Sequence, residues 1–393
     1  MINKKRKICV VLVDRANYGR MHPVMRAIQN DSGLELQTLC AGSMLLERFG
    51  QTEKVVESDG FAIDGRVFLE VEGSVPVTMA KSIGLGIIEF SSEFQRLKPD
   101  IVLLIGDRYE ALSASIAAVY MNLSLAHIQG GEISGSIDES ARHAITKLAH
   151  LHFPSTERSA HYIRKMGENP AHVINVGCPS GDYILQLNNE FPRENFLNLG
   201  VGPTIDINKA FFLVIFHPVT TEFDIVRAQA EQLIQALHDL NHPTIWIWPN
   251  IDAGSEHISK TLRVYREHHD ANWLYLVKNL EPVVYQKLLK RAACAIGNSS
   301  SFIRDSTFTG TPVVLVGDRQ FGRECGKNLK TCPPEKEAIY NAITEQLFVG
   351  RYEPIDLYGD GHSSQRIVEH LKNFQPYVQK RLNFIFENDD FNN

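Results

Sequence analysis

Short apolar runs alternate along the chain with longer segments in which apolar residues recur every three or four positions. Clear runs lie at 7–13, 101–106, 211–216 and 312–317. A continuous apolar run of this length is typical of a strand that is buried on both faces, and the segments between the runs have helical spacing. Alternating strands and helices predict parallel sheets covered by helices, which is an α/β fold.

Residues 101–143 show this pattern most clearly. The run 101–106 predicts a strand, residues 109–121 a helix, and the run 123–128 a second strand parallel to the first. In open parallel sheets, ligands bind beyond the carboxyl ends of the strands. We therefore expect the polar residues that follow these strands to converge on one rim, namely Asp107, Arg108, His127, Gln129, Glu132, Asp138 and His143.

The same alternation begins again in the second half of the chain. Residues 190–209 lose the periodicity and collect Pro, Asn and Gly, which is typical of a linker or loop. We predict two Rossmann-like, doubly wound domains that face each other across a cleft, over residues 1–185 and 205–363. Two smaller expectations are a strand at 172–177 and a terminal helix at 363–388.

Composition narrows the class of protein. The formal net charge is −6, and the sequence has no basic stripe that could neutralise a nucleic-acid backbone. We therefore expect no nucleic-acid partner. The apolar stretch Ile8–Val13 is too short for a membrane span, and we expect no membrane association. Six cysteines without a C-x-x-C pair indicate free thiols in a reducing compartment, so we expect a cytoplasmic protein.

The second half contains the best candidate anion site. Residues 297–301 (GNSSS) follow a predicted strand and open a helix, so backbone N–H groups and the helix dipole would favour a phosphate there. An ordinary serine N-cap explains the same residues equally well. His217 follows a buried strand and could act on a leaving group or a phosphate, or could be structural. Arginines placed after strands could add cationic forks for a diphosphate: Arg15, Arg108, Arg319 and Arg323.

These strand ends resemble those of the hydrolysing UDP-N-acetylglucosamine 2-epimerases of sialic acid biosynthesis. The resemblance spans almost the whole chain and rests on DRANYG (14–19), KPDIVLLIGDRYEAL (98–112), HIQGGEISGSIDESARHAITKLAH (127–150), GCPSGD (177–182), HPVTTE (217–222), PNIDAGS (249–255), IGNSS (296–300), GTPVVLVGDRQFGRE (310–324) and YGDG (358–361). It implies the glycosyltransferase-B arrangement, with a C-terminal helix (364–393) that packs back on the first domain.

The resemblance also implies a reaction. Such enzymes eliminate UDP from UDP-N-acetylglucosamine and hydrate the resulting 2-acetamidoglucal to N-acetylmannosamine. It implies acid–base roles for Asp107 and Asp138, and a role for His217 at the leaving group. The implied substrate-binding residues are Arg15, Arg108, His143, Asn250, Asn298, Ser299, Ser300, Asp305 and Arg319. The resemblance further implies no metal and no cofactor, a UDP-sugar substrate, and a homo-dimer or homo-tetramer.

Three positions depart from the family pattern. Gln129 stands where many relatives have an acid–base glutamate, and glutamine cannot take up a proton. We therefore expect that Glu132 or Asp138 takes over this acid–base function or that the activity is impaired. Met44 replaces a frequent histidine, and Asp305 a longer glutamate that reaches the ribose. A feedback site known in the animal enzyme corresponds to Lys260 and Arg263, of which only the arginine matches.

Three alternatives remain open from the sequence. The first is the same reaction on UDP-2,4-diacetamido-2,4,6-trideoxyglucose, the step toward legionaminic-type acids. The second is a non-catalytic nucleotide-sugar-binding protein that has lost a base at Gln129. The third is a glycosyltransferase of the same architecture, which the paired acids disfavour.

Overall fold

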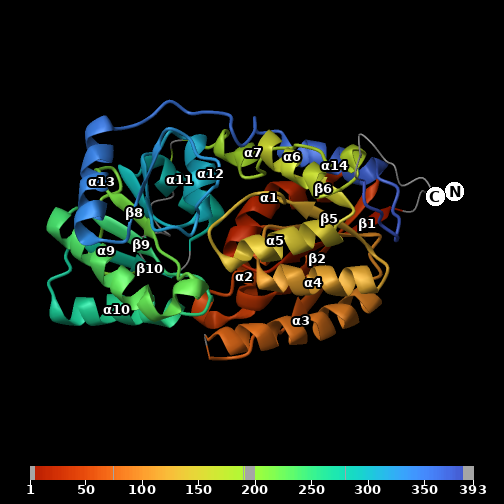
Figure 1. The fold of residues 1–393 in the computed structure, drawn as a ribbon, viewed down its shortest axis with the longest axis horizontal. Helices are drawn as coiled ribbons and strands as arrows, with labels where there is room; N and C mark the ends of the chain where they lie inside the picture. Colours follow the sequence, from red (N-terminus) through yellow and green to blue (C-terminus); the bar gives the residue numbers. More distant parts are fainter. Residues whose placement is uncertain (1–4, 74, 189, 191–199, 279, 384–393) are drawn as a thin grey trace, which may run out of the picture.

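Two α/β units lie side by side in the structure, a computed structural model (Figure 1). The structure describes residues 5–73, 75–188, 190, 200–278 and 280–383. Each unit has a central sheet with helices on both of its faces, which is the arrangement expected for buried, uniformly apolar strands.

The first unit contains a six-stranded parallel sheet with the order β3-β2-β1-β4-β5-β6. Its strands are β1 (Arg6–Leu12), β2 (Leu34–Ala41), β3 (Gly65–Val67), β4 (Ile101–Ile105), β5 (Ser124–Ile128) and β6 (Leu151–Phe153). Its main helices are α1 (Arg15–Asn30), α2 (Glu53–Ser58), α3 (Pro76–Leu97), α4 (Tyr109–Tyr120), α5 (Ile137–Leu148), α6 (Glu157–Lys165) and α7 (Gly181–Ile184).

The second unit contains a seven-stranded sheet with the order β13-β12-β11-β8-β9-β10-β7. Its strands are β7 (Gly200–Val201), β8 (Phe212–Ile215), β9 (Thr244–Ile247), β10 (Leu274–Val277), β11 (Cys294–Gly297), β12 (Val313–Val316) and β13 (Leu329–Cys332). All of them are parallel except β7, which pairs antiparallel with β10. Its helices are α9 (Val226–Leu240), α10 (Ser255–His268), α11 (Pro282–Arg291), α12 (Ser300–Thr307) and α13 (Lys336–Val349).

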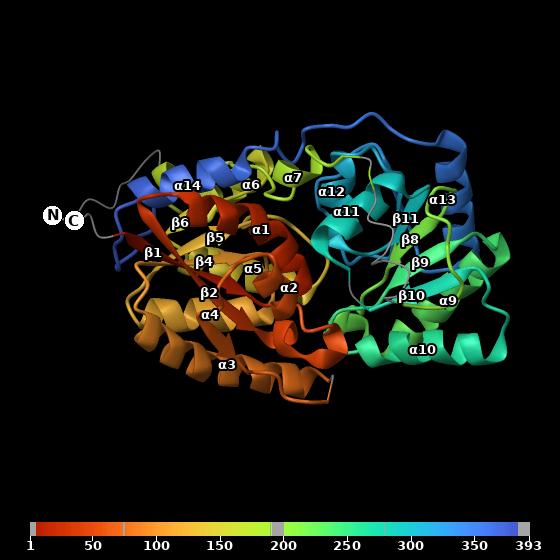
Figure 2. The same ribbon diagram turned by 180° about the vertical axis from the view of Figure 1, so that it is seen from behind.

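The end of the chain returns to the first unit. Figure 2 shows the C-terminal segment running from α13 along one edge of the molecule to α14 (Ser363–Asn373), close to the start of the chain. There α14 packs against α1. Its apolar side chains, Ile367 and Leu371 among them, belong to the buried core between α1 and the first sheet.

Several expected elements differ from the structure. No strand forms at 172–177, where one isolated bridge joins His152 to Val173. The final helix ends at Asn373 instead of 388, so the described part of 364–393 is helical only in its first turns. The first helix, which the sequence pattern predicts from about residue 20 to residue 30, starts at Arg15, because the Asp14 side chain accepts a hydrogen bond from the Asn17 N–H and caps it. The short strands β7 and β13 were not expected.

In both sheets, the direction in which successive strands are added reverses once, between two central strands. In the first sheet the chain runs outward from β1 on one side and from β4 on the other, and in the second from β8 and β11. Such a switch point leaves a crevice at the carboxyl ends of the two central strands. The residues after β1, β4, β8 and β11 are therefore placed where a ligand would bind.

A glycine makes the second crevice possible. Gly297 ends β11 with a φ of 137°, and a Cβ at this position would overlap the carbonyl oxygen of Ile215 in β8. The close approach of β8 and β11 thus requires that residue 297 have no side chain.

We predict that Gly297→Ala strongly destabilises the second unit, by about 3 kcal/mol or more, because strain at φ and a backbone overlap add together. Gly317 directly follows the neighbouring strand β12 at a φ of 79° with open space around it, so Gly317→Ala should cost only about 1 kcal/mol. Urea unfolding of both variants measures the difference. Equal losses would show that the close approach at β8 has no effect on stability.

Candidate active site

A cavity that opens to solvent lies between the two units at these strand ends. Asp14 and Arg15 reach it from the end of β1, and Asp107 and Arg108 from the end of β4. From the second unit come His217 after β8, Asn250 after β9, Ser299 and Ser300 after β11, and Arg319 after β12. Most of the residues expected at the site thus line one cavity.

Two carboxylates stand together on the first-unit side of the cavity. Asp107 forms an ion pair with the buried Arg142, whose guanidinium also donates to the backbone oxygen of Glu132 (2.7 Å). Burial is the largest single effect and would raise the pKa of Asp107, but the positive charges of Arg142, Arg323 and Arg304 together outweigh it and hold this pKa below its ordinary value. Asp107 therefore stays ionised.

Asp138 behaves in the opposite way. It lies in the first turn of α5, accepts a hydrogen bond from the Ser136 hydroxyl (3.0 Å) and contacts the Arg319 guanidinium at 3.3 Å. Burial, together with the negative charge of Asp107, raises its pKa to about 6, although Arg319 opposes the shift. Two carboxyl groups with pKa values pushed apart are suited to separate acid–base tasks.

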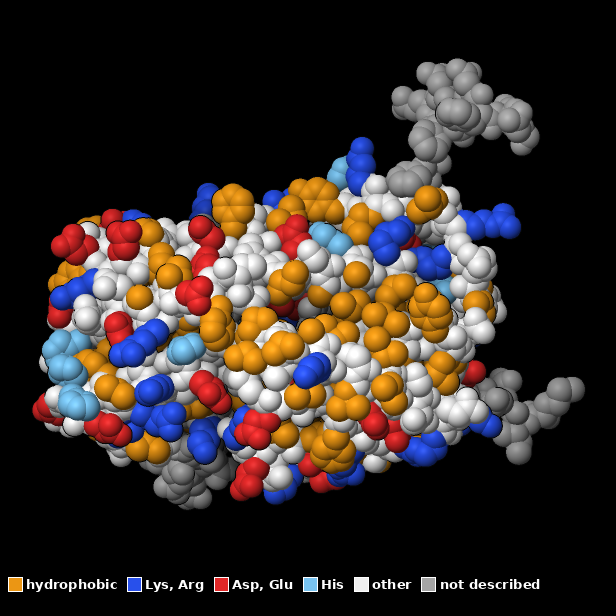
Figure 3. All heavy atoms as spheres, turned by 60° about the horizontal axis from the view of Figure 1, so that its bottom comes forward, with side chains coloured by type: hydrophobic (Ala, Val, Ile, Leu, Met, Phe, Trp, Pro, Cys, Tyr) orange, Lys and Arg blue, Asp and Glu red, His pale blue; other side chains and the backbone are white. Residues whose placement is uncertain are grey.

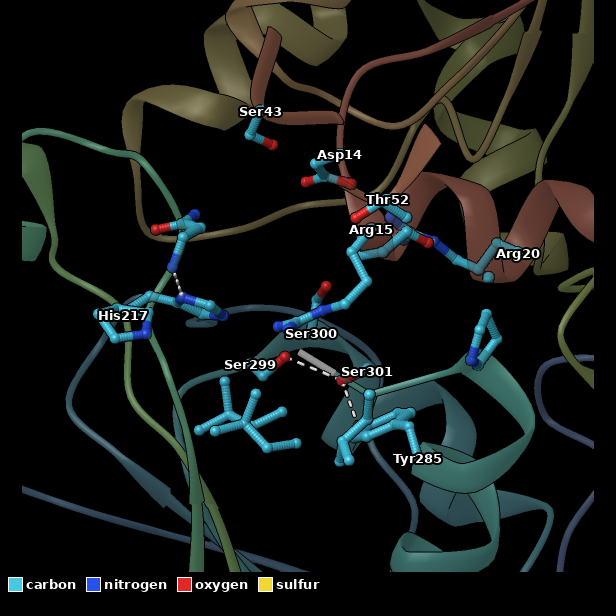
Figure 4. Close-up of a pocket in the computed structure, with 18 of the residues that line it drawn as sticks. Asp14, Arg15, Arg20, Ser43, Thr52, His217, Tyr285, Ser299, Ser300 and Ser301 are labelled. Carbon is cyan, nitrogen blue, oxygen red and sulfur yellow. Dashed lines mark hydrogen bonds between the residues drawn. The ribbon is translucent and has the colours of Figure 1, made fainter. Parts of the chain in front are cut away.

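The N-terminus of α12 forms the opposite wall. Ser299 is its N-cap, and the Ser301 hydroxyl lies 2.9 Å from that of Ser299 and 2.7 Å from that of Tyr285 (Figure 4). In Figure 4 the Arg15 side chain extends from α1 toward Ser300. The guanidinium of Arg319 donates to the Asn298 carbonyl oxygen (3.2 Å) at the same end. Hydroxyls, a helix N-terminus and arginines here make a site for an anion such as a diphosphate.

His217 is held in one tautomer. Its backbone N–H donates to Asn298 Oδ1 (2.7 Å), and its ring Nδ1 accepts from the backbone N–H of Asn250 (3.2 Å). Burial and the charges of Arg319 and Arg15 keep its pKa well below the ordinary value for histidine. The ring is therefore neutral with its hydrogen on Nε2, so it can donate a hydrogen bond but holds no extra proton to release.

Six residues that the sequence placed at the site do not line the cavity, namely His127, Gln129, Glu132, His143, Asn298 and Arg323. His127 is buried in β5, where its Nε2 lies 2.7 Å from the Gly106 carbonyl oxygen. The Glu132 carboxylate is buried and accepts hydrogen bonds from Arg304 (2.6 Å to Nη2), and it also contacts Arg323. It therefore joins the two units and cannot replace the acid–base function that Gln129 lacks. His143 pairs with Glu139 on α5 (3.5 Å). Gln129 lies behind the cavity wall, and Asn298 acts through the backbone of His217.

The structure also shows where the other residues that depart from the family pattern lie. Asp305 lines the cavity, but both of its oxygens accept hydrogen bonds from protein groups, Ser180 (2.7 Å) and Gln286 (2.6 Å). Met44 is fully buried in the first core and does not face the cavity. Lys260 lines a separate surface cavity between α9 and α10, and Arg263 is exposed beside it.

Several cavity residues were missed by the sequence analysis. They are Asp14, Arg20, Ser43, Thr52, Tyr183, Tyr285 and Gln286. Asp14 and Ser43 follow strands, a signal that was available, whereas Arg20, Tyr285 and Gln286 lie within helices and show no such signal. Among the described residues, no helix is long and apolar enough to cross a membrane.

Solved structures with this fold are known. One is a UDP-GlcNAc 2-epimerase of Methanocaldococcus jannaschii in complex with UDP-GlcNAc and UDP (TM-score 0.78, 17% identity, 94% of this chain and 100% of the other). Another is the UDP-GlcNAc 2-epimerase of Neisseria meningitidis bound to UDP-GlcNAc (TM-score 0.73, 18% identity, 94% and 100%). At such identities the likeness establishes the two-domain, glycosyltransferase-B-like fold.

Sequence relatives are closer. A UDP-N,N'-diacetylbacillosamine 2-epimerase (hydrolyzing) of Legionella pneumophila is 34% identical over 95% of this chain and 97% of its own length. A GDP/UDP-N,N'-diacetylbacillosamine 2-epimerase (hydrolyzing) of Campylobacter jejuni is 35% identical over 83% and 84%. Residues 26–372 also match the family described as UDP-N-acetylglucosamine 2-epimerase. The chain therefore belongs to the UDP-N-acetylglucosamine 2-epimerase family and is a UDP-sugar 2-epimerase.

Proposed function

We propose that this protein converts a UDP-linked 2-acetamido sugar and water into UDP and the free sugar inverted at C2. The observation that carries the proposal is the juxtaposition, in one cavity, of an ionised carboxylate, a carboxyl group with a pKa of about 6, and an anion site at a helix N-terminus. Elimination of UDP followed by hydration requires these three parts.

The anion site would hold the diphosphate. Ser299, Ser300 and the N-terminus of α12 offer hydrogen-bond donors, and Arg15 and Arg319 offer positive charge. The neutral ring of His217 would donate its Nε2–H to a phosphate oxygen. Negative charge develops on this group as the C1–O bond breaks, so these contacts strengthen in the transition state.

The two carboxylates would act at the sugar. Asp138 is the stronger base of the two and would remove the C2 proton. The electron pair of the C2–H bond then forms the C1–C2 double bond, and the C1–O bond to UDP breaks. Hydration must add a proton to the opposite face of C2 and a hydroxyl group to C1, so it needs a second group. Asp107 is ionised and has no proton of its own, so we assign it the task of orienting the water molecule that gives its proton to C2 and its hydroxyl to C1, with Arg142 fixing the carboxylate. Asp138 loses the proton that it removed to solvent.

For the sugar we propose UDP-N,N'-diacetylbacillosamine, the diacetamido alternative, because two relatives named for this substrate share about a third of their residues with this chain. UDP-N-acetylglucosamine, with N-acetylmannosamine as product for sialic acid synthesis, is the second candidate. It is supported by a UDP-N-acetylglucosamine 2-epimerase of Neisseria meningitidis that is 29% identical over 96% of this chain.

The first experiment incubates the protein with each UDP-sugar in heavy water and follows the mixture by proton NMR. We expect release of UDP and a C2-inverted sugar that carries deuterium at C2, with higher kcat/KM for the diacetamido sugar. Faster turnover of UDP-N-acetylglucosamine would reverse the choice of substrate. Binding of both without turnover would leave a nucleotide-sugar-binding protein and refute the proposed reaction.

The pKa of Asp138 predicts how activity depends on pH. Because a base must be deprotonated, kcat/KM should fall about tenfold per pH unit below pH 6 and level off above it. Asp138→Asn should lower kcat by about 10²–10⁴-fold and leave the Kd for UDP, measured by calorimetry, nearly unchanged. If the residual kcat/KM of the Asp138→Asn variant fell below pH 6 in the same way as that of the wild type, the pKa of about 6 would belong to another group.

We also propose that the protein forms a homo-dimer through the outer face of α3 and α4. Figure 3 shows hydrophobic side chains gathered over this half of the molecule, with few charged ones among them. They include Val77 (58% exposed), Ile88 (64%) and Tyr120 (84%). Gly84, with open space around it in the middle of α3, would let a second helix approach closely.

A second copy of this chain fits the face. Within the described residues, neither Lys81 nor Glu89 of α3 makes an ion pair. A two-fold axis near Leu85 would bring Lys81 of one copy level with Glu89 of the other, which favours a symmetric dimer.

Light scattering should therefore give twice the chain mass of 44.3 kDa. Ile88→Glu should shift the mass toward one chain, because it buries a charge in the apolar face. Phe348→Glu on α13, where Phe348 is 92% exposed, is the matched control and should leave the dimer intact. A monomeric wild type, or an Ile88→Glu dimer, would contradict this interface.

A further inference from the structure

Arg20 carries a positive charge into the cavity without a carboxylate partner. It lines the same cavity as Arg15 and projects from the same helix, α1. Its Nε donates to the Ala16 carbonyl oxygen (3.0 Å) and its Nη1 to Gln129 Oε1 (2.8 Å). Among the described residues, no Asp or Glu lies within ion-pair distance of it, in contrast to Arg108, Arg142 and Arg319.

Gln129 is built to hold this guanidinium. The residue follows β5 with a φ of 64°, and its side chain is fully buried. Its Nε2 donates to Cys178 Sγ (3.2 Å), which lies 3.0 Å from the Ser180 hydroxyl, and Ser180 donates to Asp305 (2.7 Å). Both ends of the amide are thus used, so its orientation is fixed by the network and its oxygen must face Arg20.

An amide and a carboxylate would do different things here. Either can accept a hydrogen bond from Arg20, but only a carboxylate would neutralise its charge. The glutamine therefore positions Arg20 and leaves the charge available to a ligand. Burial lowers the pKa of Arg20, and the positive charge of the nearby Arg304 lowers it further.

The position of Arg20 indicates which part of a ligand it meets. In Figure 4 Arg20 lies further along α1 than Arg15 and away from Ser299 and Ser300, where the diphosphate would bind. Its partner Gln129 follows β5, and β5 pairs with β4, the strand that leads to Asp107, the carboxylate on the sugar side. Arg20 is thus on the side of the reacting carbons.

We propose that Arg20 is a specificity-determining residue that binds the carbonyl oxygen of the C2 acetamido group, and that Gln129 is the positioning residue that holds it without neutralising it. The inference rests on the proposed function, since that function places an acetamido sugar beside Asp107. In this proposal Gln129 has a positioning role of its own and is not an acid–base position that has lost its function.

Two substitutions test the proposal. Arg20→Met should raise KM for the UDP-sugar about 10- to 100-fold, because a charged hydrogen-bond donor is lost. Gln129→Glu should raise KM about tenfold, because an ion pair with Arg20 competes with the substrate. Calorimetry should give a Kd for UDP within about twofold of wild type for both, since UDP carries no acetamido group.

The controls separate binding from stability. Arg26→Met removes another arginine of α1, whose guanidinium contacts Gln29 and Asp59 outside the cavity, and should leave KM unchanged. Circular dichroism checks that each variant is folded. If neither UDP-sugar is turned over by the wild type, the proposed reaction fails, but calorimetry of each UDP-sugar against UDP still tests Arg20.

Three results would overturn the proposal. A higher kcat in Gln129→Glu would show that the position calls for an acid–base group. An equal loss of UDP and UDP-sugar affinity in Arg20→Met would assign Arg20 to the diphosphate. Unchanged KM in Arg20→Met would show that its side chain does not contact the substrate.

Discussion

A single buried arginine, Arg108, has charge partners in both halves of the molecule. Arg108 leaves β4 of the first unit, donates to Glu110 of that unit (2.9 Å) and forms an ion pair with Asp252 of the second. Removing one partner of such a buried pair costs about 3–5 kcal/mol, because a charge is left without compensation. Arg108 has Glu110 as a partner within the first unit, but it reaches Asp252 only when the two units are closed upon each other, so this pair helps to hold the cavity in its present form.

Other pairs across the boundary follow the same logic. Arg319 of the second unit meets Asp138 of the first, and Arg304 meets Glu132. These residues border the cavity or lie directly behind it, so the contacts that close the two units also set the charges of the acid–base groups. Arg319, for example, opposes the rise in the pKa of Asp138 while it bridges the units. Closure and chemistry are thus two effects of one electrostatic arrangement.

The fold was predictable because apolar runs and helical spacing are local signals. The residues after β1, β4, β8 and β11 could be placed together because topology alone brings strand ends to one edge. The errors occurred where local signals mislead. Residues 172–177 resemble a strand but find only one bridging neighbour, and the helix that ends at Asn373 is followed by Pro376, a stop signal that the apolar spacing obscured. The direction of the Glu132 side chain depends on Arg304 and Arg323, which lie far away in sequence, so no local pattern could reveal it.

The return of the chain to the first unit has a consequence for synthesis on the ribosome. The core under α1 includes Ile367 and Leu371 of α14, which are among the last described residues. At a synthesis rate of about 5–20 residues per second, the first unit is complete in sequence many seconds before α14 emerges. During that interval its α1 face exposes apolar surface that only the end of the chain covers. The nascent first half is therefore a natural client for chaperones, and a chain truncated before α14 would remain one.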